Sequence, residues 1–153
     1  MKNHKIKKNY IFIDESGKPE VYSTRGANLV ESGQATKFLV LAAIRTTDQL
    51  DLQQKVTDFK SKLLKNNNLL TIFSSAYALD NFHAQTDYPE VKEKFYKFIN
   101  TLYIMIDVLV VEKLQCFPAL KENPGKMYGV MAGQLLKNLC HHAEETEIVF
   151  SRK

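Results

Sequence analysis

Apolar residues follow two kinds of pattern along the chain, and each kind predicts a different element. Three short runs rich in β-branched and aromatic residues predict an opening set of strands at residues 10–14, 21–24 and 38–44. The third run, FLVLAAI, is apolar at successive positions, which suits a central strand buried on both faces. Because the connections between the runs are short, the pattern predicts an antiparallel meander at the start of the chain.

Further along, apolar residues recur at intervals of three and four, which is typical of amphipathic helices. The first such stripe follows possible N-caps at residues 46–48 and consists of Leu52, Val56, Phe59 and Leu63. A second helix is expected after Pro89, and a third from Asn123-Pro124 towards Cys140. Apolar runs at residues 103–111 and 147–150 predict two more strands. The resulting order, βββ-α-α-β-α-β, predicts an α/β fold layered around a mixed sheet.

The composition fits a single globular domain with an ordinary core. The 153 residues are 44% hydrophobic and 25% charged, which excludes disorder and collagen-like repeats. Two cysteines are too few for a disulfide framework, so reduced thiols are expected. No run approaches the roughly 20 apolar residues that cross a bilayer. These features predict a cytoplasmic protein without a membrane partner.

The net charge of +4 is mild, and much of it lies in a basic arm over residues 1–9 that contains Lys2, Lys5, Lys7 and Lys8. This arm is either a solubilising terminus or a segment that contacts phosphate groups. Charge alone does not choose between the two interpretations.

The segment YIFIDESG, residues 10–17, is the most informative for chemistry. Asp14 and Glu15 close an otherwise apolar strand, and the two-residue period of a strand places them on opposite faces if the strand continues. Since an ionised group is costly to bury unpaired, at least one carboxylate must reach water, a donor or a cation. Carboxylate oxygens suit Mg²⁺. Alternatively, Asp14, Ser16 and Gly17 form a simple turn.

This segment, the strand FLVLAAI and the later NFHA motif resemble the family named domain of unknown function 3800. The resemblance runs from Tyr10 to Phe150 and implies a ribonuclease-H-like three-layer domain over residues 10–153. It implies a nuclease that hydrolyses DNA or RNA with Mg²⁺ or Mn²⁺. By matching position, Asp14 would be the bridging metal ligand and Glu15 a second catalytic or metal-binding carboxylate. Ser16 would orient a ligand, and His83 would shuttle a proton or contact the phosphate.

A two-metal site usually needs three or four carboxylates, so further ligands are required. Asp107 lies inside the strand-like run YIMIDVLVV and is a candidate ligand, or else an edge residue that faces solvent. Beyond the last strand, Arg152 and Lys153 are candidate contacts to the substrate. A domain that ends on its own strand is expected to be shortened at its C-terminus. The alternative function is a non-catalytic module of the same fold that binds nucleic acid or protein. A third carboxylate within about 5 Å of Asp14 would favour catalysis, since metal–oxygen bonds measure roughly 2.0–2.6 Å.

Overall fold

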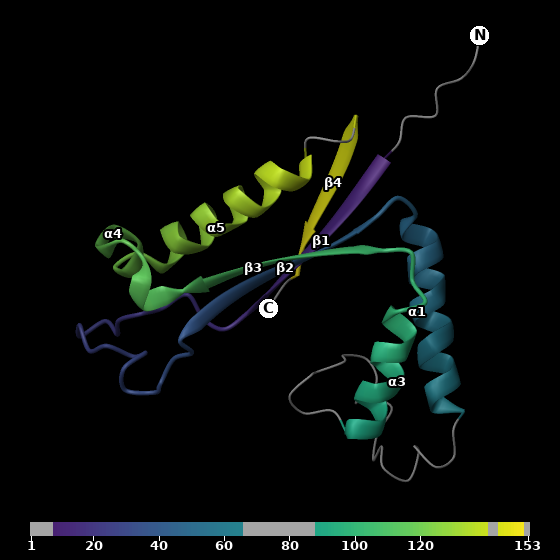
Figure 1. Ribbon diagram of the computed structural model, residues 1–153, viewed down its shortest axis with the longest axis horizontal. Helices are drawn as coiled ribbons and strands as arrows, with labels where there is room; N and C mark the ends of the chain where they lie inside the picture. Colours follow the sequence, from purple (N-terminus) through teal and green to yellow (C-terminus); the bar gives the residue numbers. More distant parts are fainter. Residues whose placement is uncertain (1–7, 66–87, 141–143, 152–153) are drawn as a thin grey trace. The chain divides into compact units, whose positions relative to one another are not determined.

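The computed structural model describes residues 8–65, 88–140 and 144–151. The chain divides into two compact units. The sheet unit combines residues 1–47 with residues 104–153, and the helical unit consists of residues 48–103 (Figure 1). The helical unit is therefore an insertion between two strands of the sheet unit.

The sheet unit is built on a four-stranded mixed sheet. Its strands are β1 (Lys8–Ser16), β2 (Phe38–Thr46), β3 (Met105–Glu112) and β4 (Glu145–Phe150). Their spatial order is β3-β2-β1-β4. The pairs β1–β2 and β2–β3 are antiparallel, whereas β1–β4 is parallel. The expectation of an α/β fold around a mixed sheet is confirmed.

The predicted strand at residues 21–24 is wrong. That segment forms one isolated bridge, between Tyr22 and Asn28, and no strand of the sheet. The local reason is a tight turn: the Ser23 hydroxyl accepts hydrogen bonds from the backbone N–H groups of Arg25 and Ala27, at 3.3 and 3.1 Å. Gly26 has a φ of +80° within this turn. The third antiparallel strand is instead β3, which the chain reaches only after the helical unit.

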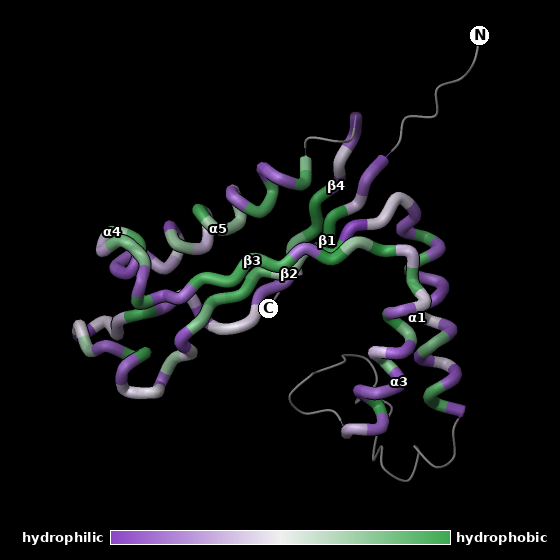
Figure 2. Tube along the Cα trace, viewed as in Figure 1, coloured by the Kyte–Doolittle hydropathy of each residue, from purple (hydrophilic) through white to green (hydrophobic). Residues whose placement is uncertain are grey.

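Strict alternation along β1 and β2 decides which face of the sheet is buried. The residues on the buried face are fully or almost fully inaccessible, and they are Ile11, Ile13, Leu39, Leu41 and Ala43. They pack against helix α5 (Pro124–Leu139), which contributes Met127, Met131, Leu135 and Leu139. Figure 2 shows hydrophobic stretches along these strands and along α5. Burying each of the isoleucine, leucine and methionine side chains stabilises the fold by about 1.5–3 kcal/mol. The expected N-cap of this helix is confirmed, because the Asn123 side chain accepts from Lys126 N–H at 2.9 Å.

Short helical turns connect β3 to α5 and hold a buried lysine. They are η2 (Lys113–Gln115) and α4 (Pro118–Lys121). Lys113 is fully buried, and its ammonium donates to the carbonyl oxygens of Lys18 and Glu20, both at 2.9 Å. These bonds tie the loop after β1 to the end of β3.

The helical unit contains α1 (Gln49–Leu64) and α3 (Pro89–Ile99). The Asp48 side chain caps α1 by accepting from Asp51 N–H at 2.9 Å, as its position before the apolar stripe predicts. The aromatic rings of Phe59 and Phe98 stack with centroids 4.3 Å apart. The two helices therefore have an apolar contact of their own.

Candidate functional site

The register of the sheet separates the two acidic residues that close β1. Strand β1 continues through Ser16, and Asp14 lies opposite Ala42 while Glu15 lies opposite Leu41. Leu41 belongs to the face covered by α5. Because neighbouring residues of a strand alternate between faces, Glu15 lies on the α5 side and Asp14 on the opposite side. We call the side of Asp14 the second face of the sheet.

Asp14 lies where the carboxyl ends of two parallel strands meet. Ser151 directly follows β4, and its backbone N–H donates to Ile13 O at 2.9 Å. The Ser151 hydroxyl donates to Asp14 Oδ1 at 2.5 Å. This bond fixes one oxygen of an exposed carboxylate. Nothing in the sequence near Ser151 marks it as a partner of Asp14. The parallel register of β1 and β4 is what identifies it as a neighbour of Asp14.

Asp107 is not brought together with Asp14. In β3 it lies opposite Ala43, a residue of the α5 face, so the sheet separates the two carboxylates. The Asp107 Oδ2 atom instead accepts a charge-assisted hydrogen bond from Arg45 Nε at 2.8 Å. Both side chains are largely screened from solvent, with 33% and 17% of their surface exposed. The geometry assigns Asp107 to an ion pair across neighbouring strands.

The other candidates are only partly within the described residues. Ser16 lies on the second face, two positions beyond Asp14 on the same strand. His83, Arg152 and Lys153 lie outside the described residues. Within the part of the chain that the structure describes, no group of three or more His, Cys, Asp or Glu side chains could hold a metal ion.

The basic arm expected over residues 1–9 ends earlier than the sequence indicates, because Lys8 already belongs to β1. Its ammonium forms ion pairs with Glu147 at 2.9 Å and Glu145 at 3.2 Å, which hold the pKa of Lys8 above its usual value. These contacts join the starts of the two parallel strands. Lys2, Lys5 and Lys7 lie outside the described residues.

The donors around Asp14 fit one magnesium ion better than a pair. Mg²⁺ commonly binds through one or two carboxylates, phosphate oxygens of the substrate and several waters. Asp14 supplies one exposed carboxylate, and Ser151 supplies a neighbouring hydroxyl. A two-metal centre requires bridging and flanking carboxylates, and the described residues form no cluster of three or more such ligands, while Glu15 lies on the other face of the sheet.

Comparisons with known proteins add no relative. No family model matches the chain, and neither a curated protein nor a solved structure shows significant similarity to it. Among the described helices, none combines the length and apolar character that crossing a membrane requires.

Proposed function

We propose that this chain is a ribonuclease-H-like domain that hydrolyses phosphodiester bonds of DNA or RNA with the help of Mg²⁺ or Mn²⁺. The observation that carries the proposal is the position of Asp14 at the carboxyl end of β1, beside the carboxyl end of the parallel strand β4. In open α/β sheets, ligands bind outside the carboxyl ends of the strands.

The sheet order supports the ribonuclease-H-like part of the proposal. A ribonuclease-H-like core begins with three antiparallel strands and continues with helices that alternate with parallel strands. Strands β1, β2 and β3 are antiparallel neighbours, α5 follows, and β4 then pairs in parallel with β1. In this comparison the helical unit is an insertion between the second and third strands.

Asp14 and Ser151 have separate tasks in the proposed site. Ser151 donates to Oδ1 and thereby orients the carboxylate, so that Oδ2 is directed away from this bond. Asp14 is exposed, so a phosphate group can approach it from solvent. A bound divalent cation would supply Lewis-acid stabilisation of the charge that develops on the phosphate oxygens. Glu15 is left out of the site because it lies on the α5 face.

The test is a cleavage assay with labelled single- and double-stranded DNA and RNA, with Mg²⁺, Mn²⁺ or EDTA. We expect Asp14→Asn to lower metal-dependent cleavage by about 10²-fold or more, the usual scale for losing a group that stabilises transition-state charge. Glu15→Gln is the matched control, since it removes a neighbouring carboxylate from the other face, and it should keep the wild-type rate. Titration of Mn²⁺ by calorimetry gives a second readout, in which only Asp14→Asn weakens binding. Equal cleavage by the wild type and Asp14→Asn would refute the assignment.

The second candidate function is a module of the same fold that binds nucleic acid without cleaving it. It is favoured by the ion pair that Asp107 forms with Arg45 and by the absence, among the described residues, of a cluster of three or more metal-binding side chains. Retained binding of the labelled nucleic acids without cleavage in either metal would support this candidate.

A further inference from the structure

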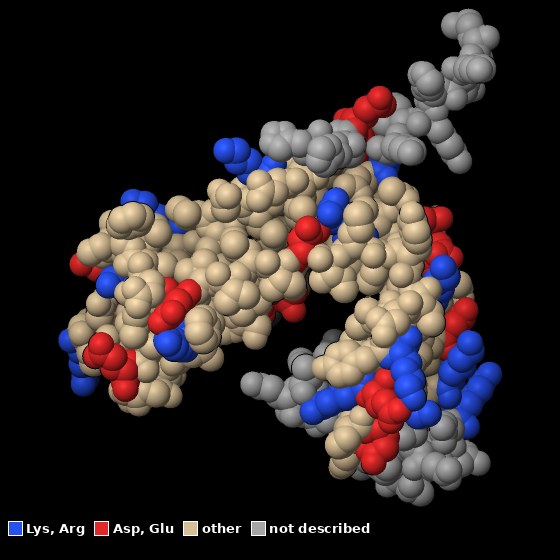
Figure 3. Space-filling view, in the orientation of Figure 1, with Lys and Arg blue, Asp and Glu red and all other residues tan. Residues whose placement is uncertain are grey.

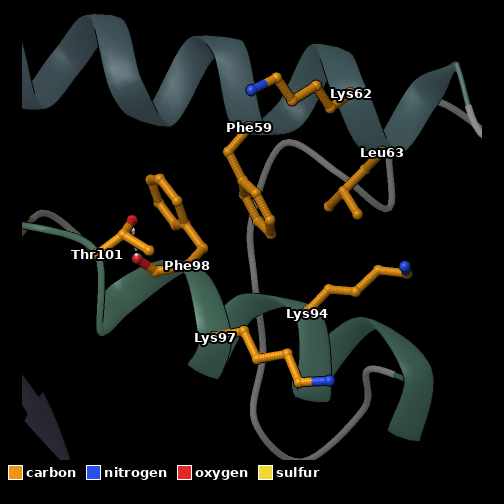
Figure 4. Close-up of a pocket in the computed structure, with 7 residues that line it drawn as sticks. All are labelled: Phe59, Lys62, Leu63, Lys94, Lys97, Phe98 and Thr101. Carbon is orange, nitrogen blue, oxygen red and sulfur yellow. Dashed lines mark hydrogen bonds between the residues drawn. The ribbon is translucent and has the colours of Figure 1, made fainter.

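The helical unit contains a groove between α1 and α3 that the proposed function does not use. Its volume is about 410 Å³, within the range of about 300–1,000 Å³ that is common for ligand pockets. Figure 4 shows that both helices contribute side chains, which are Phe59, Lys62, Leu63, Lys94, Lys97, Phe98 and Thr101. The groove is large enough to accept a nucleotide-sized group.

The floor of the groove is aromatic. The rings of Phe59 and Phe98 are almost parallel, at an interplanar angle of 4°, and Leu63 is buried beside them. Both rings are half-buried, so part of their surface remains open to solvent. One face of each ring is occupied by the other ring, so the outer faces and edges remain for a nucleic-acid base, which stacks on aromatic side chains without regard to sequence.

The rim of the groove is basic. Lys62 comes from α1, and Lys94 and Lys97 come from α3 (Figure 4). Lys97 is paired with Glu93 at 2.5 Å, and this contact lowers the pKa of the Glu93 carboxyl. Among the described residues, Lys62 and Lys94 have no ion-pair partner. Figure 3 shows Lys side chains over these two helices, with Asp and Glu side chains among them. The charge balance of the rim therefore attracts anions.

We propose that this groove binds a short stretch of single-stranded nucleic acid, with bases against the Phe59–Phe98 surface and phosphates beside Lys62, Lys94 and Lys97. The combination of a stacking surface and a cationic rim favours this occupant, because free phosphate offers no ring and an acidic peptide offers no base to stack. The inference rests on the proposed function for its class of ligand. It concerns a separate surface, however, and requires no metal.

The test measures fluorescence anisotropy of a labelled oligothymidylate with the full chain in EDTA, so that no metal-dependent cleavage occurs. The groove variant carries Lys62→Gln, Lys94→Gln and Lys97→Gln. The matched control carries Lys55→Gln, Lys65→Gln and Lys92→Gln, which remove the same charge from lysines outside the groove lining. The control is also matched in ion pairs, since Lys55 pairs with Asp51 as Lys97 pairs with Glu93.

We expect the groove variant to weaken binding at least about tenfold at low salt. The slope of log affinity against log salt should fall by about 2, because each phosphate contact on a single strand contributes about 0.7. The control should change the slope by less than half of that amount. An abasic oligonucleotide of equal length tests the stacking surface without altering the protein, and it should bind the wild type more weakly than oligothymidylate.

Equal slopes for the groove variant and its control would overturn the proposal. So would equal affinity for the abasic and thymidine strands, or equally strong competition by polyglutamate, because each result would leave only a general attraction for anions. Asp14→Asn separates this inference from the proposed function. Binding in EDTA that survives Asp14→Asn but is lost in the groove variant supports the groove, whether or not the wild type cleaves. Cleavage by a protein whose binding does not depend on the groove lysines would support the nuclease and refute the groove proposal.

Discussion

Replacing Lys113 with methionine should destabilise the sheet unit by about 2–4 kcal/mol. Lys113 is fully buried, and its ammonium satisfies the carbonyl oxygens of Lys18 and Glu20. Methionine fills similar space but donates no hydrogen bond, so both carbonyls lose their donor at about 1–3 kcal/mol each. The variant no longer has to bury a charge, and this gain offsets part of the loss. The expected value therefore lies below the sum of the two carbonyl terms.

The assay is urea unfolding followed by circular dichroism, with the midpoint and the slope both fitted. Lys126→Met is the matched control, because Lys126 is an exposed lysine of α5, and it should stay within about 0.5 kcal/mol of the wild type. If Lys113→Met loses no more unfolding free energy than the control does, the claim that this lysine ties the loop after β1 to β3 is refuted.

Comparing the wild type with Lys113→Met also tests the direction in which the pKa of Lys113 is shifted. Burial lowers the pKa of Lys113 below its ordinary 10.5, and the nearby Glu20 carboxylate opposes this effect in part. Between the folded pKa and 10.5 the unfolded state binds more protons, so wild-type stability should rise with pH relative to Lys113→Met. A neutral amine still has two N–H groups for the two carbonyls. A stability difference that shrinks across this alkaline window would show that the pKa is raised instead.

Three further substitutions test the framework around the site by the same unfolding assay. Gly17→Ala should lower the free energy of unfolding by about 2 kcal/mol or more, because the φ of Gly17 is +87° and an added Cβ would lie 2.7 Å from Phe38 O. Asn123→Ala should cost about 1 kcal/mol through loss of the α5 cap, and a change below about 0.3 kcal/mol would contradict the capping role. Asp107→Asn should destabilise the sheet by about 1–3 kcal/mol, because it leaves the Arg45 guanidinium without its charged partner, but it should not change Mn²⁺ affinity. Weakened Mn²⁺ binding by Asp107→Asn would indicate that Asp107 is a metal ligand after all.

Local patterns were sufficient to predict most of the elements. The stripe from Leu52 to Leu63 and the Asn123-Pro124 start signal both correspond to helices with side-chain caps. These features depend on residues within one or two turns of each other, which a sequence displays directly. The α/β class followed from the same signals.

Features that depend on distant residues could not be predicted in the same way. The run at residues 21–24 has strand-like composition, yet the local turn at Ser23 and Gly26 keeps it out of the sheet. Lys113 appears as an ordinary charged residue until the loop after β1 is placed over it. The contact between Asp14 and Ser151 joins residues 137 positions apart, so only strand order and register reveal it.

Alternation within the strands limits where a second carboxylate for Asp14 could come from. On the second face, β2 presents Phe38, Val40, Ala42, Ile44 and Thr46, none of which is acidic. The nearest second-face positions of β3 are Ile106, Val108 and Val110, while Glu112 lies opposite Phe38 at the far end and pairs with Lys37. In β4, Glu147 lies beside Tyr10, four residues before the Ser151 position. The strands themselves therefore leave Asp14 as the one carboxylate on the second face at this strand end, so activity in an Asp14→Asn variant could not be attributed to another acid of the strands on this face.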